Sequence, residues 1–579
     1  MKRTKIVCTI GPASDAPEIL EQLMLNGMNV ARLNFSHGTH EEQKARVERI
    51  KEIREKLDLP VALLLDTKGP EIRTGTFKDD HAEFEVGQKV VIRHKDILGN
   101  ANEFSVTYKT LAQDLKDGSI ILIDDGLIEL AVEYIDDKDV HCVVKNGGAL
   151  SNRKSVNLPG ISSNLPALTE KDVEDIKFAI EHDFDFIAAS FVRKADDIRK
   201  IRSVLEEHNG DFINIIAKIE NQEGVDNFNE ILDVSDGIMV ARGDLGVEIP
   251  PQKVPVLQKQ MIRSCYSKGK SSITATQMLD SMIRNPRPTR AEVSDVANAI
   301  MDGTSAVMLS GETASGDYPV ESIKMMNNIC ETTENAYDYW EAFRQDTQYI
   351  APSVTNAVGH ACCMTAMDLK AKAIVAVTLG GRTARLMSRF RPSCPIIAPT
   401  VSLRARRQLN ICWGVVPVLV KELIDTDDLF KMGMQKALDT GIVEEGDIVV
   451  ISGGTPVGVS GMTNTMRVQT VGRLLSQGIG INLGKATGEV RVITPENRQQ
   501  VDLADMRNSV IVVHDTDNSM LPILKVCRAI VAETDNPDCH AVTVGKILEL
   551  PVVYNCKNAT RILKEGTSVI VDSERGLVN

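Results

Sequence analysis

Short apolar runs alternate with amphipathic stretches through the first third and the middle of the chain. Each run ends in a polar or charged residue, and the stretches between the runs have the period of an α-helix. Eight strands that alternate with helices predict a (β/α)8 TIM barrel, whose active site forms at the C-terminal ends of the strands. The eight runs begin at Lys5, Asn29, Val61, Phe184, Ile213, Gly237, Ser271 and Ser305.

Polar residues stand at or just after the ends of most of these runs. A single polar residue after a strand is usually a solvated start of a loop. Several that converge on one barrel mouth indicate a site instead. These residues are Arg32, Asn34, Asp66, Lys218, Glu220, Asp244, Thr276 and Glu312.

The pattern changes over residues 69–165, where strand-like runs are punctuated by Gly, Asn and Asp. We interpret this segment as an inserted β-barrel domain, so that the catalytic barrel comprises residues 1–68 and 166–339. A domain at the catalytic end of a barrel is well placed to act as a lid that excludes water. Helix and strand alternate again over 340–473, which predicts a smaller α/β domain, and the strand-rich tail, 474–579, predicts a further domain.

Composition and charge narrow the possible functions. The chain is 43% hydrophobic and 25% charged, as expected of a soluble globular enzyme, and its formal net charge of -14 disfavours a nucleic-acid surface. The first apolar run meets Gly11 and Pro12 too early for a signal or membrane segment. The eleven cysteines form no C-x-x-C pair and indicate reduced thiols. We therefore expect a cytoplasmic protein with no membrane or nucleic-acid partner.

Seven sequence motifs narrow the class of enzyme to which the predicted barrel belongs. They are MNVARLNFSHG from Met28, LLLDTKGPEIRTG from Leu63, IIAKIENQEG from Ile215, GIMVARGDLGVEI from Gly237, ATQMLDSM from Ala275, RPTRAEVSDVANAIMDG from Arg287 and SGETASG from Ser310. In this order they resemble the pyruvate kinases. The resemblance implies an enzyme that transfers the phosphoryl group of phosphoenolpyruvate to ADP. It also implies Mg²⁺ or Mn²⁺ and K⁺ as cofactors, a phosphorylated effector and a homotetramer.

Phosphoryl transfer requires positive charge beside the phosphate and hard oxygen ligands for a divalent cation. Glu220 and Asp244 follow predicted strands, and the resemblance makes them the Mg²⁺ ligands. Lys218 lies two residues before Glu220, so both side chains face the same side of a strand. The resemblance implies that the Lys218 ammonium stabilises negative charge on the transferring phosphoryl group and on the developing enolate, as a fixed cation does.

The resemblance also assigns the other substrate contacts. Arg32 binds the substrate phosphoryl group, and the backbone amides of Gly243 and Asp244 hold the substrate carboxylate. Thr276 lies beside the face of the enol that is protonated. An unperturbed hydroxyl is a poor acid near neutral pH, so we expect a water chain through Thr276, with Ser310 and Glu312 nearby, to deliver the proton.

Two further sets of residues follow from the same resemblance. The K⁺ ligands are Asn34, Ser36, Asp66 and Thr67, and Glu71 is the residue type that accompanies K⁺ dependence, whereas a lysine there replaces the cation. Nucleotide contacts are expected from Asn34, Arg73 and His37, with His37 supporting the loop after the second strand.

The segment TLGGRTA follows an apolar run and precedes an amphipathic stretch, so its amides can form an anion nest at the start of a helix. The resemblance makes it an effector loop, with Thr378, Gly380, Gly381, Arg382 and Thr383. An ordinary glycine turn is the alternative. The later loop GGTPVGVSG lacks the Trp and Arg of members tuned to fructose 1,6-bisphosphate, so we expect a monophosphate such as ribose 5-phosphate or AMP.

The tail resembles the swivelling phosphohistidine domain of phosphoenolpyruvate-utilising enzymes. Asp538 and Cys539 replace the Thr and Ser that precede the histidine in that family, so we interpret His540 as a relic. Two other functions remain open. A phosphoenolpyruvate synthase or dikinase requires an ATP-grasp region, and none is visible. A catalytically silent phosphosugar sensor is disfavoured because Lys218 and the other site residues are intact.

Overall fold

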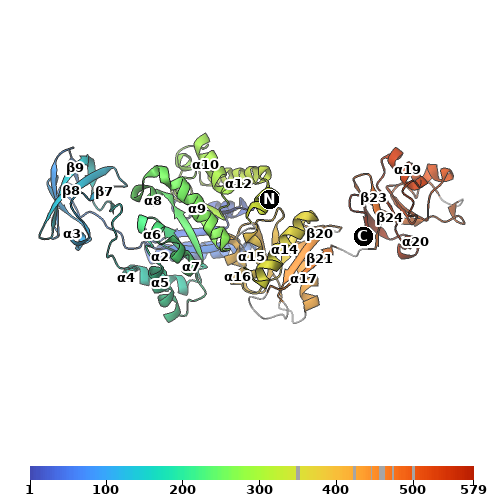
Figure 1. The fold of residues 1–579 in the computed structure, drawn as a ribbon, viewed down its shortest axis with the longest axis horizontal. Helices are drawn as coiled ribbons and strands as arrows, with labels where there is room; N and C mark the ends of the chain where they lie inside the picture. The colour runs from blue at the N-terminus through green and yellow to red at the C-terminus, as the bar shows by residue number, and fades with distance from the viewer. Residues whose placement is uncertain (347–351, 422–425, 445, 455–462, 472–474, 499–501) are drawn as a thin grey trace. The chain divides into compact units, whose positions relative to one another are not determined.

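The computed structural model describes residues 1–346, 352–421, 426–444, 446–454, 463–471, 475–498 and 502–579. These residues belong to two compact units (Figure 1). The first unit comprises residues 1–356 and 378–419, and the second comprises residues 357–377 and 420–579.

The first unit contains the predicted barrel. Eight parallel strands close on themselves in the order β1-β16-β15-β14-β13-β12-β3-β2. Every one of the eight apolar runs forms one strand, so the predicted fold class is confirmed. The strands are β1 (Lys5–Thr9), β2 (Val30–Asn34), β3 (Ala62–Asp66), β12 (Phe186–Ala189), β13 (Asn214–Ile219), β14 (Gly237–Ala241), β15 (Ser271–Ala275) and β16 (Ala306–Leu309).

Helices follow the strands, and three of them begin with a capping box, at Thr39, Thr169 and Thr289. In each box the threonine hydroxyl accepts a backbone N–H of the first turn while an acidic side chain returns to the threonine N–H. The main barrel helices are α1 (Pro17–Leu25), α2 (His40–Lys56), α4 (Glu170–Glu181), α5 (Ala195–Glu207), α7 (Phe228–Val234), α9 (Val254–Ser267), α10 (Arg290–Met301) and α12 (Pro319–Ala336). Further helices in the loops are α6 (Gln222–Asp226), α8 (Arg242–Glu248) and α11 (Gly311–Ala314).

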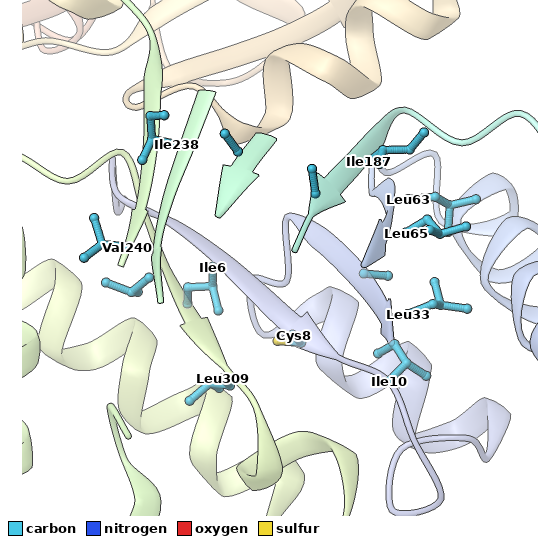
Figure 2. Close-up of a cluster of buried hydrophobic side chains, with 14 of the residues drawn as sticks. Ile6, Cys8, Ile10, Leu33, Leu63, Leu65, Ile187, Ile238, Val240 and Leu309 are labelled. Carbon is cyan, nitrogen blue, oxygen red and sulfur yellow. The ribbon is translucent and has the colours of Figure 1, made fainter. Parts of the chain in front are cut away.

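Alternation along the strands divides their side chains between two layers. Leu33, Leu65 and Ile187 belong to the buried cluster that packs between strands and helices (Figure 2). Side chains of a strand alternate between its two faces, so Arg32 and Asp66, next to Leu33 and Leu65, face the barrel interior. The same alternation places the Lys218 side chain in the barrel interior, because its neighbour Ile219 belongs to the cluster between strands and helices.

The segment between β3 and α4 is rich in strands and has its own apolar core, which includes Phe84, Phe104 and Leu130. Its strands form a sheet of order β11-β7-β8-β9-β5-β6 and a pair of order β10-β4. Its elements are β4 (His81–Phe84), β5 (Lys89–Arg93), β6 (Glu103–Ser105), α3 (Leu111–Asp114), β7 (Ile120–Ile123), β8 (Ile128–Asp136), β9 (Asp139–Asn146), β10 (Gly148–Ser151) and β11 (Val156–Asn157).

The rest of the first unit is bound to the barrel by ion pairs. The Arg407 guanidinium contacts Asp185 Oδ1 through Nε and Asp183 Oδ2 through Nη2, each at 2.7 Å. Two parallel strands, β18 and β19, pair in this part. Its elements are α13 (Tyr339–Asp346), α15 (Arg382–Arg389), β18 (Ile396–Thr400), α16 (Leu403–Gln408) and β19 (Val415–Leu419).

The second unit contains two groups of strands. In the first group β17 (Ala373–Ala376) pairs in parallel with β20 (Ile448–Gly453), which pairs antiparallel with β21 (Thr465–Thr470). The tail strands form one sheet of order β22-β29-β28-β24-β25-β26-β27-β23. The tail elements are β22 (Ser476–Gln477), β23 (Ile479–Ile481), β24 (Lys485–Val492), β25 (Ser509–Val513), α18 (Leu521–Leu524), β26 (Ala529–Ala532), α19 (His540–Leu548), β27 (Val552–Tyr554), α20 (Ala559–Ile562), β28 (Ser568–Asp572) and β29 (Leu577–Val578).

Two further helices, α14 (Val354–Asp368) and α17 (Thr426–Asp439), lie in the chain before β17 and β20 respectively. Among the residues that the structure describes, no helix has both the length and the apolar character that crossing a membrane requires.

Candidate active site

The C-terminal ends of β2 and β3 bring the first pair of predicted site residues together. Arg32 donates from Nε to Asp66 Oδ2 at 2.7 Å. Burial opposes ionisation of the Asp66 carboxyl, but the charges of Arg32 and Lys218 outweigh burial and hold its pKa below the usual value. Asp66 therefore remains a carboxylate and fixes the direction of the guanidinium.

Lys218, on β13, is surrounded by oxygen acceptors. Its Nζ lies 3.1 Å from Asp66 Oδ1, 2.8 Å from Ser190 Oγ and 2.9 Å from Glu220 Oε1. The residue is only 8% exposed. Burial disfavours the charged amine, but Asp66 and Glu220 overcome that effect and raise its pKa, so Lys218 is a permanent ammonium. Its three N–H donors are all directed by the protein.

Glu220 and Asp244 form the acidic side of this cluster. Glu220 is 1% exposed, and its Oε2 accepts the backbone N–H of Phe191 at 2.6 Å. Burial raises the pKa of Glu220 to about 7, against the opposing charge of Lys218, and the nearby Asp244 carboxyl adds to the increase. Burial also raises the pKa of Asp244. Two neighbouring carboxyl groups with raised pKa values are costly to ionise together. A hard cation bound by their oxygen atoms would neutralise that charge.

Thr276 follows β15 in a strained turn that reaches the start of α8. Thr276 and Gln277 have φ angles of 69° and 54°, in the left-handed region that such residues rarely adopt. The Gly243 N–H donates to Thr276 Oγ1 at 2.8 Å. Arg242 holds the turn by donating to the Thr276 carbonyl at 2.8 Å and pairing with Asp295 at 2.7 Å. The structure thus joins Gly243 and Thr276, two of the predicted substrate contacts.

Glu312 and Ser310 lie at the start of α11, next to this turn. The Glu312 carboxylate accepts the backbone N–H groups of Leu279 at 3.0 Å and Ser310 at 2.7 Å. Both oxygens therefore hold loops in place. Ser310 Oγ is buried and, among the described residues, has no hydrogen-bond partner.

The four predicted K⁺ ligands belong to the ends of β2 and β3. Asn34 and Asp66 are partners in the register of the two strands. Asn34 Oδ1 accepts the Ser36 N–H at 3.0 Å, and Thr67 Oγ1 accepts the Ser190 N–H at 3.1 Å. The structure places these oxygen-bearing residues together beside the Arg32–Asp66 pair.

The two other residues expected to contact the nucleotide, Arg73 and His37, form hydrogen bonds within the protein. The Arg73 guanidinium binds both oxygens of Glu71 at 2.8 Å and the Arg153 carbonyl at 2.7 Å, within the inserted segment. His37 is exposed, and its carbonyl accepts from Gln43 Nε2 at 2.9 Å, which supports the loop after β2.

Two hydroxyl groups at the site were not among the predicted residues. Thr9 Oγ1 accepts from Arg32 Nη1 at 2.8 Å, and Ser190 Oγ accepts from Lys218 Nζ at 2.8 Å. They lie within the runs KIVCTIG and FDFIAASFV, the two runs for which no site residue was proposed, Thr9 as the last residue of β1 and Ser190 directly after β12. Their place at strand ends of the same barrel was the available signal.

The predicted effector loop lies at the start of α15. Gly381 has φ 88°, and its N–H donates to Thr378 Oγ1 at 3.0 Å. The Arg382 side chain is exposed. In the later loop, residues 455–462 lie outside the described residues.

His540 begins α19 in the tail. Its Nδ1 lies 2.7 Å from Thr516 Oγ1 and its Nε2 lies 3.1 Å from Asn518 Oδ1. Both ring nitrogens are therefore engaged with neutral side chains, and the reading of His540 as a relic stays a prediction.

The fold and the cluster together define a barrel enzyme with a group of paired charges at the C-terminal mouth of the barrel. Two fixed cations, Arg32 and Lys218, stand beside two carboxyl groups at the barrel mouth. Such an arrangement suits a reaction in which negative charge moves between oxygen atoms.

Comparison with known proteins identifies the class more closely. Family models match residues 1–323 as "Pyruvate kinase, barrel domain", 356–469 as "Pyruvate kinase, alpha/beta domain" and 506–576 as "PEP-utilising enzyme, mobile domain". A pyruvate kinase of Sporosarcina psychrophila is 48% identical, and one of Bacillus licheniformis 49%, each over 100% of this chain and 99% of the relative.

A solved structure agrees. The crystal structure of a pyruvate kinase from Cryptosporidium parvum superposes with a TM-score of 0.79 at 40% identity, covering 81% of this chain and 96% of that one. The chain belongs to the pyruvate kinase family, and it is a phosphotransferase.

Proposed function

We propose that the cluster around Lys218 transfers the phosphoryl group of phosphoenolpyruvate to ADP, with Mg²⁺ or Mn²⁺ and K⁺ as cofactors, and that a phosphorylated metabolite activates the enzyme. The observation that carries this proposal is the Lys218 ammonium, which Asp66, Ser190 and Glu220 hold beside Arg32. A lactate dehydrogenase-coupled assay with phosphoenolpyruvate and ADP tests it. Pyruvate formation that requires both substrates supports the proposal, and its absence contradicts it.

Arg32 and Lys218 would place two positive charges beside the phosphoryl group before and during transfer. The phosphoryl group leaves the enol oxygen of phosphoenolpyruvate and joins a terminal oxygen of ADP, so negative charge appears on the enolate. The Lys218 ammonium is already oriented and largely excluded from water, where preorganised charge stabilises such an enolate most.

The substrate carboxylate is proposed to bind the N–H groups of Gly243 and Asp244. The Gly243 N–H donates to Thr276 Oγ1 without substrate, so substrate binding would take that donor from the threonine. Thr276 Oγ1 could then accept from a water molecule, while its own hydroxyl hydrogen is donated to the Ala275 carbonyl at 2.6 Å. The proton relayed to the enolate would therefore come from the proposed water chain.

The residues present fit a divalent cation. Glu220 and Asp244 are two adjacent, largely buried carboxyl groups. Within the described residues no group of three or more His, Cys, Asp or Glu side chains could hold a metal, so water and substrate oxygens would complete the set, as is common for Mg²⁺. When bound, the ion would offset charge on the phosphoryl group.

The K⁺ proposal rests on the residues at the ends of β2 and β3. Asn34, Ser36, Asp66 and Thr67 offer oxygen atoms, and the Asp66 charge is already shared by Arg32 and Lys218. Nucleotide contacts are proposed for Asn34, His37 and Arg73, with residues 69–165 as a lid. The proposal includes a cytoplasmic homotetramer, in keeping with the symmetry of most soluble oligomers.

Glu71→Lys is expected to relax the K⁺ requirement, because it would supply a fixed ammonium near the cation site. We expect the variant without K⁺ to keep activity about 10-fold above that of the parent, a difference of roughly 1.4 kcal/mol. Glu71→Gln is the matched control, since it also removes the pair with Arg73 but adds no charge. Initial rates in K⁺-free buffer and in saturating K⁺ give the ratio. Equal K⁺ dependence in all three proteins would rule out this role.

Arg382→Ala is expected to abolish activation by a phosphorylated effector while leaving the rate without effector unchanged. The backbone at Gly381 and the exposed Arg382 side chain suit a phosphate at the start of α15. Coupling of ~1–3 kcal/mol would shift the apparent affinity for phosphoenolpyruvate about 5-fold or more.

Phosphoenolpyruvate saturation curves with ribose 5-phosphate, AMP and fructose 1,6-bisphosphate test this prediction. We expect the monophosphates to shift the curve most, and Arg467→Ala, another exposed arginine, to behave as the parent. If no compound shifts the curve, the loop is an ordinary turn. A larger effect of the bisphosphate would contradict the proposed effector class.

A further inference from the structure

A cavity of about 270 Å³ lies at the end of the barrel opposite the active site. Its wall includes Gly303, which precedes β16, and Tyr266, near the end of α9 and before β15. These residues stand at the N-terminal ends of strands, whereas Lys218 and Asp66 stand at the C-terminal ends. We call it the Arg391 cavity, after the buried arginine in its lining.

Arg391 is a buried cation that forms no ion pair in the described part of the chain, and the Glu334 carboxylate acts on its charge only from beyond ion-pair distance. It is 9% exposed, and its Nη2 donates to the Gly303 carbonyl at 2.8 Å and to Ser305 Oγ at 3.2 Å. Its Nε is buried and, among the described residues, has no hydrogen-bond partner. Burial lowers the pKa of Arg391 to about 10, which still leaves it charged at neutral pH. A buried charge without a partner is costly, so an anion at this position would be stabilised.

Aromatic rings surround this guanidinium. The Arg391 Cζ lies 4.8 Å from the centre of the Trp413 ring and 5.7 Å from that of Tyr266, and both rings line the cavity. Trp413 is 3% exposed. These faces offer a planar ligand a stacking surface, and they also keep the cation away from water.

The charges on the lining favour an anion. Lys259 and Arg391 contribute cations to the lining, and Asp302 contributes a carboxylate. Asp302 is paired with Lys259 at 2.9 Å, so it does not neutralise Arg391. The volume is slightly below the ~300–1,000 Å³ typical of drug-sized ligands, which indicates a small molecule.

We propose that the Arg391 cavity binds a small aromatic carboxylate, whose ring stacks against Trp413 and Tyr266 and whose carboxylate accepts from Arg391 Nε. A neutral aromatic molecule would gain the stacking but would leave the guanidinium unpaired. This site is distinct from the proposed catalytic cluster and from the effector loop, and its occupancy does not depend on either.

The chain offers a direct probe, because Trp340 and Trp413 are its only tryptophans. In the full-length Trp340→Phe variant, indole fluorescence reports Trp413 alone. We would titrate this variant with 4-nitrobenzoate, a quenching aromatic carboxylate, and with neutral 4-nitrobenzamide. We expect saturable quenching with at least about 10-fold tighter binding of the acid, because a charge-assisted hydrogen bond adds roughly 1.4 kcal/mol or more.

Three substitutions in the same background complete the test. Arg391→Gln should reduce the affinity for the acid to that for the amide. Lys259→Gln, at a pocket residue whose side chain is largely exposed, should weaken acid binding about 3-fold and serves if Arg391→Gln fails to fold. Arg404→Gln is the matched control, since Arg404 stacks on Phe212 at 3.6 Å outside the cavity, and it should bind as the parent. Equal affinity for acid and amide, no saturable quenching, or unchanged acid binding in both cavity variants would overturn the proposal.

Discussion

Replacing Lys218 with methionine is expected to lower kcat by about 10³-fold, the upper end of the roughly 10²–10³-fold that removal of one preorganised charge donor typically costs. The fold should survive the change. Asp66 keeps its ion pair with Arg32, and Glu220 keeps the Phe191 N–H. The pKa of Glu220 is already raised to about 7, so this carboxyl can take up a proton when the ammonium is removed.

Lys5→Met is the matched control for this prediction. Lys5 is also a buried lysine on a barrel strand, but it stands at the N-terminal end of β1 and donates to the Val415 carbonyl at 2.6 Å. We expect this variant to keep at least half of the parent's kcat. Steady-state rates with circular dichroism as a check of folding distinguish the two variants. Near-parent turnover in folded Lys218→Met would refute the role of this ammonium.

Asp244→Asn is expected to have the second-largest effect, a decrease in kcat/KM of about 10²-fold together with a higher half-saturating Mg²⁺ concentration. A bound metal stabilises charge in the transition state by several kcal/mol, and the amide removes one of its two proposed carboxylate ligands. Asp244 lies next to Glu220 at the barrel mouth, where burial already raises the pKa of both carboxyl groups.

Glu248→Gln serves as its control. Glu248 lies one turn further along α8, its pKa is also raised by burial, and it accepts from Asn157 Nδ2 at 2.9 Å. We expect the Mg²⁺ dependence of this variant to match that of the parent. Rates measured over a range of Mg²⁺ concentrations decide the matter. If the two variants lose activity equally, or if Asp244→Asn has an unchanged Mg²⁺ dependence, Asp244 does not hold the metal.

Much of the fold was predictable because barrel strands are buried on both faces. Such strands appear in a sequence as short, continuous apolar runs, and all eight runs formed strands. Part of the site was predictable as well, since the C-terminal ends of parallel strands in a closed barrel meet at one mouth. This rule brings together Arg32, Asp66, Lys218 and Glu220.

Other parts of the site depend on long-range packing that no local pattern records. Ser190 and Thr9 are ordinary strand-end hydroxyls in the sequence, and only the barrel brings them to Lys218 and Arg32. The Arg242 bond to the Thr276 carbonyl joins residues 34 positions apart and supports a left-handed turn at a threonine. The Arg391 cavity likewise requires α9, the start of β16 and the segment around Trp413 to pack together.

Phosphorus NMR of the reaction mixture tests the central claim most directly. With phosphoenolpyruvate, ADP, Mg²⁺ and K⁺, we predict that the phosphoenolpyruvate signal falls as the γ-phosphate signal of ATP rises in equal amount, and that the Lys218→Met protein shows neither change. Conversion that fails with ADP but proceeds with AMP and phosphate or pyrophosphate in its place would indicate a synthase or dikinase. An unchanged spectrum with the folded parent protein would contradict the account.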